Sequence, residues 1–143
     1  MIGVTFQQAK QGFFDREKVQ RSVDAATRRV LSKFGAFVRQ RAKTSIRSRK
    51  GTSPPGSPPY SHVGLLKKFI LFAYDATRKS VVIGLTLIRA ESTAPRLLEH
   101  GGATTLETPR GSKRARYRPR PFMGPEFVAE QAQLPALWQN SVR

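Results

Sequence analysis

The sequence has no cysteine, only nine acidic residues and two histidines, and no long apolar run. Without cysteine the chain forms no disulfide bond and has no thiol chemistry, which is compatible with a cytosolic origin. No stretch of about 18 apolar residues is present, so we expect no transmembrane helix. The first residues lack a basic segment followed by a sustained apolar one, so we expect no signal peptide.

The same shortages argue against an enzyme. A metal site would need several carboxylates, because the two histidines have no ligand spacing and only Glu99 is close to one of them, His100. The nucleophile-elbow, Walker and dinucleotide-binding glycine patterns are absent. Glu99 and His100 precede two glycines, which indicates the end of a helix. We therefore expect no catalytic residue, no cofactor and no metal.

Basic residues, in contrast, are abundant. The chain has 26 lysines and arginines against 9 acidic residues, a formal net charge of +17. Such a chain binds polyanions with strong salt dependence, whatever its function. Nucleic acid, acidic protein surfaces and anionic membranes are all candidates, and charge alone does not choose among them. The sequence contains no zinc-finger or RNP pattern and no clear helix-turn-helix pair, so nothing in it indicates recognition of a nucleic-acid sequence.

The length of 143 residues, with 38% hydrophobic residues, indicates one domain with a modest core. We predict an α+β fold in which a long N-terminal helix packs on a small antiparallel sheet. In chain order we expect an N-terminal arm or strand (1–14), the long helix (15–48), a proline-rich arm (49–62), a β-rich body (63–124) containing a basic hairpin (103–117), and a C-terminal helix (125–143).

The long helix is predicted from its apolar periodicity. Apolar residues recur at steps of three and four from Val19 to Ile46, and no proline interrupts them. Asp15 is the predicted N-cap. Gly35, inside the helix, predicts a bend or a close contact with another helix. The basic residues lie mostly off the apolar stripe, where they form either a solvated face or a face that meets a partner.

Two hairpins are predicted after the proline-rich arm. Apolar segments at 69–74 and 81–88 flank a polar turn, which is typical of an antiparallel pair. Gly84 in the second segment predicts a bulge or a close backbone approach. Residues 103–116 predict a second hairpin, whose tip at 109–114 extends into solvent.

Proline and glycine also punctuate the last part of the chain. A short helix is predicted to begin at Ala94, because Pro95 is suited to the first turn of a helix. Gly101 and Gly102 are predicted to end it. The closing helix, 126–139, is predicted to be kinked or broken at Pro135.

The segment 52–66, TSPPGSPPYSHVGLL, separates the long helix from the β-rich part. Four prolines exclude a helix from 53 to 59, because proline fixes φ and restricts the residue before it. Tyr60 supplies an aromatic anchor, and Leu65 and Leu66 begin a new element. Composition alone equally allows a flexible linker.

The proline-rich segment, with Gly64-Leu65-Leu66 after it, resembles the signature of the tail-component family of tailed bacteriophages with long non-contractile tails. These proteins are also called neck or tail-completion proteins. Two later segments are similar to further motifs of that family, A-P-R-L-L-E-H-G at 94–101 and R-P-R-P-F-M-G-P at 118–125. The resemblance covers roughly residues 15–140, and it is most specific where the proline-rich segment and the R-P-F pair occur together.

The resemblance implies a structural virion protein of the head–tail junction, assembled in the host cytoplasm. It implies a homo-oligomeric ring, a hexamer, that joins the head connector to the tail tube and surrounds the DNA path. The partners would be neighbouring copies, the adjoining connector or head-closure and tail-tube proteins, and DNA in the channel without sequence specificity, but no membrane. The sequence does not choose among terminator, closure and adaptor rings. A small basic nucleic-acid-binding module is the alternative.

Two sets of candidate site residues follow. Extended proline-rich segments bind neighbours at low entropic cost, because they are already restricted. The candidates for subunit or partner contact are therefore Pro54, Pro55, Pro58, Pro59, Tyr60, Leu65, Leu66, Arg118, Pro119, Arg120, Pro121 and Phe122. The candidates for contact with DNA or an acidic partner are Arg110, Lys113, Arg114 and Arg116 of the predicted hairpin, and Arg39, Lys43 and Arg47 of the long helix.

Overall fold

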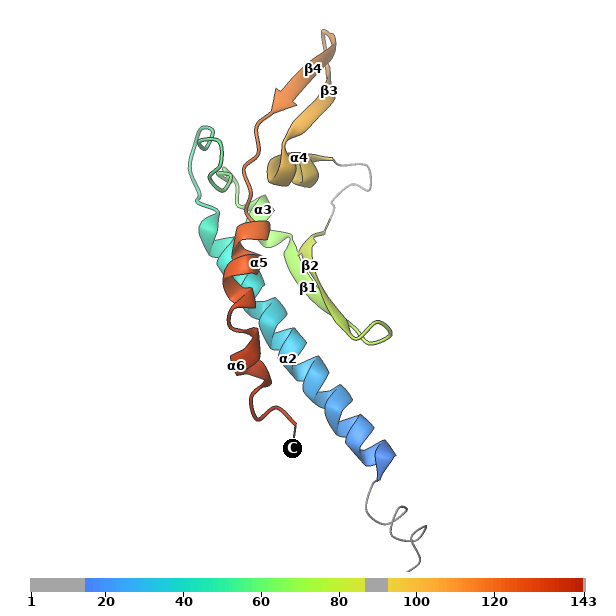
Figure 1. The fold of residues 1–143 in the computed structure, drawn as a ribbon. Helices are drawn as coiled ribbons and strands as arrows, with labels where there is room; N and C mark the ends of the chain where they lie inside the picture. Colours follow the sequence, from blue (N-terminus) through green and yellow to red (C-terminus); the bar gives the residue numbers. More distant parts are fainter. Residues whose placement is uncertain (1–14, 87–92, 143) are drawn as a thin grey trace, which may run out of the picture.

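The computed structural model describes residues 15–86 and 93–142 and has the predicted α+β fold. One long helix, α2 (Arg16–Ser45), crosses the molecule in Figure 1. The β1–β2 hairpin lies along one side of it, and the helices α5 and α6 lie along the other. The predicted N-terminal arm or strand lies outside the described residues.

Helix α2 has the periodicity that the sequence predicts. Its buried residues are Ala26, Val30, Phe34, Gly35, Val38 and Ala42, which recur at steps of three and four. The predicted cap is confirmed, because Asp15 Oδ1 accepts a hydrogen bond of 3.0 Å from the Lys18 backbone N–H. The helix ends three residues earlier than predicted, since Ile46 is already in an extended conformation.

The first predicted hairpin is confirmed as β1 (Ile70–Asp75) and β2 (Ser80–Leu85), which pair antiparallel. Asp75 fixes the turn, since its Oδ1 accepts the backbone N–H groups of Thr77 and Arg78 at 2.9 and 3.1 Å. The prediction for Gly84 is wrong. Gly84 pairs with Leu71 in regular register, and an added Cβ there would meet nothing within 4 Å.

Gly35 marks the close contact between α2 and this hairpin. A Cβ on Gly35 would lie 2.7 Å from Val81 Cγ2 and 2.9 Å from Phe72 Cδ2. The close contact that the sequence predicts therefore exists, but it is with a β-hairpin and not with another helix. Glycine at this position lets the sheet approach the helix backbone.

We expect Gly35→Val to lower the free energy of unfolding by about 1–3 kcal/mol, because the new side chain must displace Val81 and Phe72 from a packed contact. Urea unfolding followed by circular dichroism measures the change. Gly84→Ala is the control and is expected to cause no such loss. Its added Cβ enters open space in the folded protein, and alanine has less conformational freedom than glycine in the unfolded chain. Equal losses from both substitutions would contradict this packing.

The C-terminal part forms two helices, α5 (Gly124–Gln131) and α6 (Leu134–Trp138), where a single kinked or broken helix was predicted. The break precedes Pro135, which stands in the first turn of α6, where its missing N–H costs no helical hydrogen bond. The rings of Phe34 and Phe127 pack edge to face, with centroids 5.5 Å apart, and so attach α5 to α2.

The remaining elements are two short helices and a second hairpin. Helices α3 (Leu65–Lys68) and α4 (Ala94–His100) lie near the C-terminal end of α2 in Figure 1. The predicted basic hairpin is confirmed as β3 (Gly102–Thr108) and β4 (Gly111–Tyr117), joined at Pro109 and Arg110. It projects away from the rest of the molecule, at the top of Figure 1.

The best-buried cluster lies at the C-terminal end of α2. Ala42, Ile46, Ile70 and Phe122 are almost fully buried there. Partly buried residues of α3, β2, α4 and the start of α5 pack against them, namely Leu66, Leu85, Leu98 and Met123. Segments far apart in the sequence are thus brought together where the proline-rich segment begins.

Candidate functional site

The proline-rich segment, residues 49–62, is a loop that folds back onto the end of α2, and we call it the proline loop. The backbone N–H of Ser61 donates to the carbonyl oxygen of Arg47 at 3.0 Å, and Tyr60 forms a parallel bridge with Arg47. Ser53 and Pro59 are buried. The predicted proline-rich arm is thus a loop, because these contacts join its C-terminal end to the end of α2.

A turn forms the tip of the proline loop. The N–H of Ser57 donates to the carbonyl oxygen of Pro54 at 3.2 Å, and Gly56 between them has a φ of 80°. Proline followed by glycine with positive φ is the sequence of a type II turn, which only glycine adopts without strain at its third position. The Pro55-Gly56 step thus accounts for the reversal of the chain.

The proline loop binds the segment before α5. The N–H of Gly56 donates to the carbonyl oxygen of Pro119 at 2.9 Å, and Arg120 Nε donates to the carbonyl oxygen of Ser53, also at 2.9 Å. Two segments that are extended and rich in proline, and therefore offer few N–H donors, are joined through one backbone and one guanidinium donor.

Glu99 completes this contact from α4. Its carboxylate accepts the backbone N–H groups of Phe122, Met123 and Gly124 at 3.0, 3.1 and 2.7 Å. These groups begin α5, which has no capping side chain of its own at Met123. A negative charge at the start of a helix satisfies free N–H groups and complements the helix dipole. We call the contact of the proline loop, Glu99 and residues 118–124 the junction.

The junction changes the interpretation of the first candidate set. Phe122, 1% exposed, lies in the core, and Pro59 is also buried, so neither side chain is available to a partner. The guanidinium group of Arg120 donates hydrogen bonds to the carbonyl oxygens of Ser53 and Arg118 in the same chain. Of the remaining candidates, Pro54, Pro55, Leu65, Arg118 and Pro119 are exposed, whereas Pro58, Tyr60, Leu66 and Pro121 are half-buried.

The basic candidates of α2 also separate. Arg39 Nε donates to the carbonyl oxygen of Ile70 at 2.9 Å, so this side chain holds β1 against the helix and is not a free cation. Lys43 is half-buried, and desolvation, followed by repulsion from Arg39, lowers its pKa. Only Arg47 of these three has an exposed side chain.

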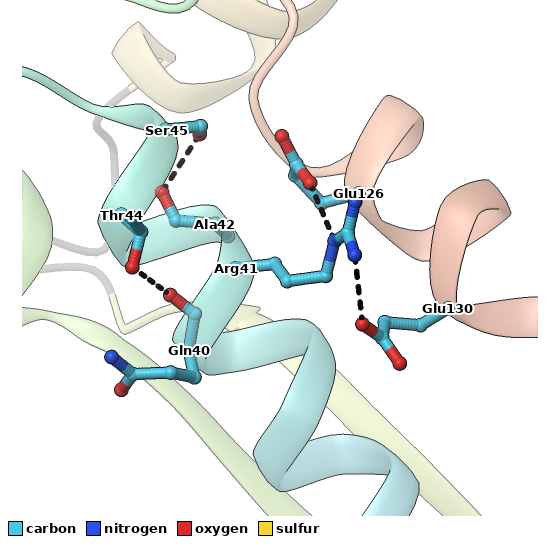
Figure 2. A network of polar contacts seen from close by, with 7 residues as sticks. All are labelled: Gln40, Arg41, Ala42, Thr44, Ser45, Glu126 and Glu130. Atoms are coloured by element: carbon cyan, nitrogen blue, oxygen red, sulfur yellow. Dashed lines mark hydrogen bonds and ion pairs between the residues drawn. The ribbon is translucent and has the colours of Figure 1, made fainter. Parts of the chain in front are cut away.

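Sequence reasoning missed an arginine on the same helix, Arg41. Figure 2 shows its guanidinium between two carboxylates of α5, with Nε 3.1 Å from Glu126 and Nη1 3.3 Å from Glu130. The hydrogen bond to Glu126 raises the pKa of Arg41. The spacing of Glu126 and Glu130, one helical turn apart, was the signal that one cation bridges them.

The β3–β4 hairpin, Gly102–Tyr117, carries the remaining basic candidates, and we call it the basic ribbon. Arg110 stands at its turn, and Lys113, Arg114 and Arg116 are exposed on β4. In the register, Arg114 is opposite Thr105 and Arg116 is opposite Ala103. Because side chains alternate between the faces of a strand, both arginines project from one face and Lys113 from the other.

A hollow lies at the base of the basic ribbon. It is lined by Arg116, Arg118 and His100, together with Gly101, Gly102, Tyr117 and Pro119. The two arginines therefore face a common space. Open to solvent and lined by cations, this hollow has the electrostatics of an anion site.

The acidic residues of the described chain are, with one exception, bound to groups of the same chain. Asp24 accepts from Lys79 at 2.6 Å, and this hydrogen bond lowers the pKa of Asp24. Asp15, Asp75, Glu99, Glu107, Glu126 and Glu130 also accept hydrogen bonds from groups of this chain. Glu17, in the first turn of α2, is the exception among the described acids.

Residues 15–86 and 93–142 contain no cluster of three or more histidine and acidic side chains placed to hold a metal ion. No helix within the same residues is long and apolar enough to cross a membrane.

Comparisons with protein-family models, with curated proteins and with solved structures found no match to this chain.

Proposed function

We propose that the protein is a structural component of a phage head–tail junction, where copies of it form a ring around the DNA path. The observation that carries the proposal is the intramolecular junction, where the proline loop, Glu99 and residues 118–124 meet. The three sequence segments that resemble the tail-component family are far apart in the chain, yet Ser53, Glu99 and Arg120 bring them into one contact. Their meeting in one contact supports interpreting the three segments as parts of one structural unit.

An exposed apolar face supports self-association. On the β1–β2 hairpin, Leu71 and Ala73 lie opposite Gly84 and Val82, on the face that does not pack against α2. Val82 is 62% exposed and Leu71 45% exposed. Leu71, Ala73 and Val82 form an apolar patch on this face, and Asp75, paired with Arg78, lies at its turn end. Such a patch on a chain with net charge +17 is suited to a neighbouring subunit, because burying these three side chains desolvates no charge.

We expect Val82→Lys to prevent ring formation, because a lysine in the middle of this face would be desolvated by the neighbouring subunit. Sedimentation velocity of nuclease-treated protein measures the effect, and circular dichroism shows that the variant folds. Thr77→Lys, in the exposed turn of the same hairpin, adds the same charge and is expected to leave assembly unchanged. Assembly of the Val82→Lys protein like the unmodified chain would contradict the assignment of this face.

The basic ribbon favours the second candidate function, a nucleic-acid-binding module. The two functions differ in what they require of the apolar face. A ring subunit must bury the Leu71–Val82 face against a neighbour without DNA, whereas a binding module remains a monomer until DNA is added.

A further inference from the structure

The basic ribbon lacks the interior contacts that usually stabilise a hairpin. Its two strands form a sheet of their own, and no third described strand pairs with either edge. Only Thr104, Ala115 and Tyr117 of its strands are half-buried, and the other residues are exposed. An isolated two-stranded hairpin is marginally stable in water. A bound partner would therefore stabilise the ribbon.

The partner must be anionic and is not another copy of this chain. Around its single acid, Glu107, the ribbon carries Arg110, Lys113, Arg114 and Arg116, and Glu107 is occupied by Ser112 at 2.7 Å. Among the described acids only Glu17 has no bond within the chain. The described residues of a second copy thus offer few unpaired carboxylates to match these cations, and two basic ribbons would repel each other.

The composition of the arginine face favours nucleic acid over an acidic protein. Beside Arg114 and Arg116 it presents Ala103, Thr105 and Ser112, with no large apolar side chain. Glu107 lies at the turn end of the same face, where it accepts a hydrogen bond from Ser112. Protein interfaces owe most of their affinity to buried aromatic and apolar anchors, which this face lacks. Phosphate backbones are instead bound by arginine, serine and threonine side chains.

The spacing of the arginines also fits a regular polymer. Arg114, Arg116 and Arg118 occur at every second residue, so along an extended chain their origins are about 6.6–6.8 Å apart. Arg116 and Arg118 line the same hollow. A row of guanidinium groups, each able to bind a phosphate through two hydrogen bonds, matches an evenly charged backbone.

We propose that the basic ribbon binds the phosphate backbone of duplex DNA through Arg114, Arg116 and Arg118, without reading its sequence. A two-stranded β-ribbon is narrow enough to enter the major groove, which would place both strands between phosphate rows. The inference deepens the second candidate function by naming the ligand and the residues that bind it, and it holds for a ring subunit and for a single chain alike.

The test is fluorescence anisotropy of a labelled duplex titrated with nuclease-treated protein over a range of salt concentrations. The double variant Arg114→Gln with Arg116→Gln is expected to bind about 10-fold more weakly, and its slope of log affinity against log salt should fall by about 2. The control, Arg21→Gln with Arg28→Gln on exposed positions of α2, removes the same charge. It is expected to change affinity less than about 3-fold.

Two outcomes would overturn the proposal. Equal losses in the ribbon variant and in the α2 variant would mean that net charge alone causes binding. Preferential binding of poly-glutamate over duplex DNA at the same salt concentration, lost in the ribbon variant, would assign the ribbon to an acidic protein. Neither outcome depends on ring formation, which Val82→Lys tests separately.

Discussion

Replacing Phe122 with alanine is expected to lower the free energy of unfolding by about 3–5 kcal/mol, the usual cost of truncating a buried aromatic side chain. Phe122 is 1% exposed and packs with Ala42, Ile46 and Ile70, so the truncation leaves a cavity between α2, β1 and the segment before α5. Urea unfolding followed by circular dichroism measures the loss.

Phe127→Ala is the matched control, because Phe127 is 42% exposed and contacts Phe34 by its ring edge. We expect this control to cost about 1 kcal/mol. If Phe122→Ala cost no more than Phe127→Ala while disrupting assembly, Phe122 would be a partner contact, as the sequence predicts, and not a core residue.

Replacing Glu99 with alanine is expected to cost about 2–3 kcal/mol, because three backbone N–H groups at the start of α5 lose a charged acceptor. Glu99→Gln should recover part of the loss, since one carbonyl oxygen remains. The same urea unfolding measures both variants, and hydrogen exchange at Met123 and Gly124 reports the cap directly.

Glu107→Gln is the control for Glu99, since Glu107 is exposed on the ribbon and bonds only Ser112. It is expected to change the free energy of unfolding by less than about 0.5 kcal/mol. If the Glu99→Ala protein had the same free energy of unfolding as the unmodified chain, and no amide of α5 exchanged hydrogen faster, the carboxylate would not hold the junction.

Local patterns in the sequence were sufficient for most of the fold. The apolar stripe of α2 and its cap at Asp15 depend on residues three and four positions apart, so periodicity alone predicts them. The first hairpin follows from two β-branched and apolar strands around a polar turn, and the second from the turn signal at Pro109-Arg110-Gly111. The roles of Gly35 and Gly84 were harder to predict, because the effect of a missing Cβ depends on what packs at that position. Val81 and Phe72 pack against Gly35, whereas an added Cβ at Gly84 would meet nothing within 4 Å.

The candidate site was less predictable, because its contacts join residues far apart in the chain. Arg120 bonds Ser53, and Glu99 bonds the backbone of Phe122. Nothing local to either residue indicates these partners. The prolines were correctly excluded from helix, but whether they form an arm or a loop depends on Gly56 meeting Pro119, which no pattern shows.

The net charge of +17 does not show where the cations lie, whereas the structure places an apolar surface and a basic surface on different hairpins. On β1–β2, Leu71, Ala73 and Val82 form an apolar patch, whereas the basic ribbon has one exposed large aliphatic side chain, Leu106. Association of like-charged subunits requires such a separation, because ionic strength near the physiological value screens charges only beyond about 8 Å. In the proposed ring, neighbours would meet on the apolar face while the cations remain available for DNA.

The mass of nuclease-treated protein, measured by light scattering across a chromatography peak at low and high salt, tests the ring most directly. We expect one discrete species at several times the 16.0 kDa of the chain, and about 96 kDa for a hexamer, with the same mass at both salt concentrations because the proposed contact is apolar. A 16.0 kDa monomer that gains mass only with duplex DNA, and loses it as salt rises, would contradict the ring and favour the nucleic-acid-binding module.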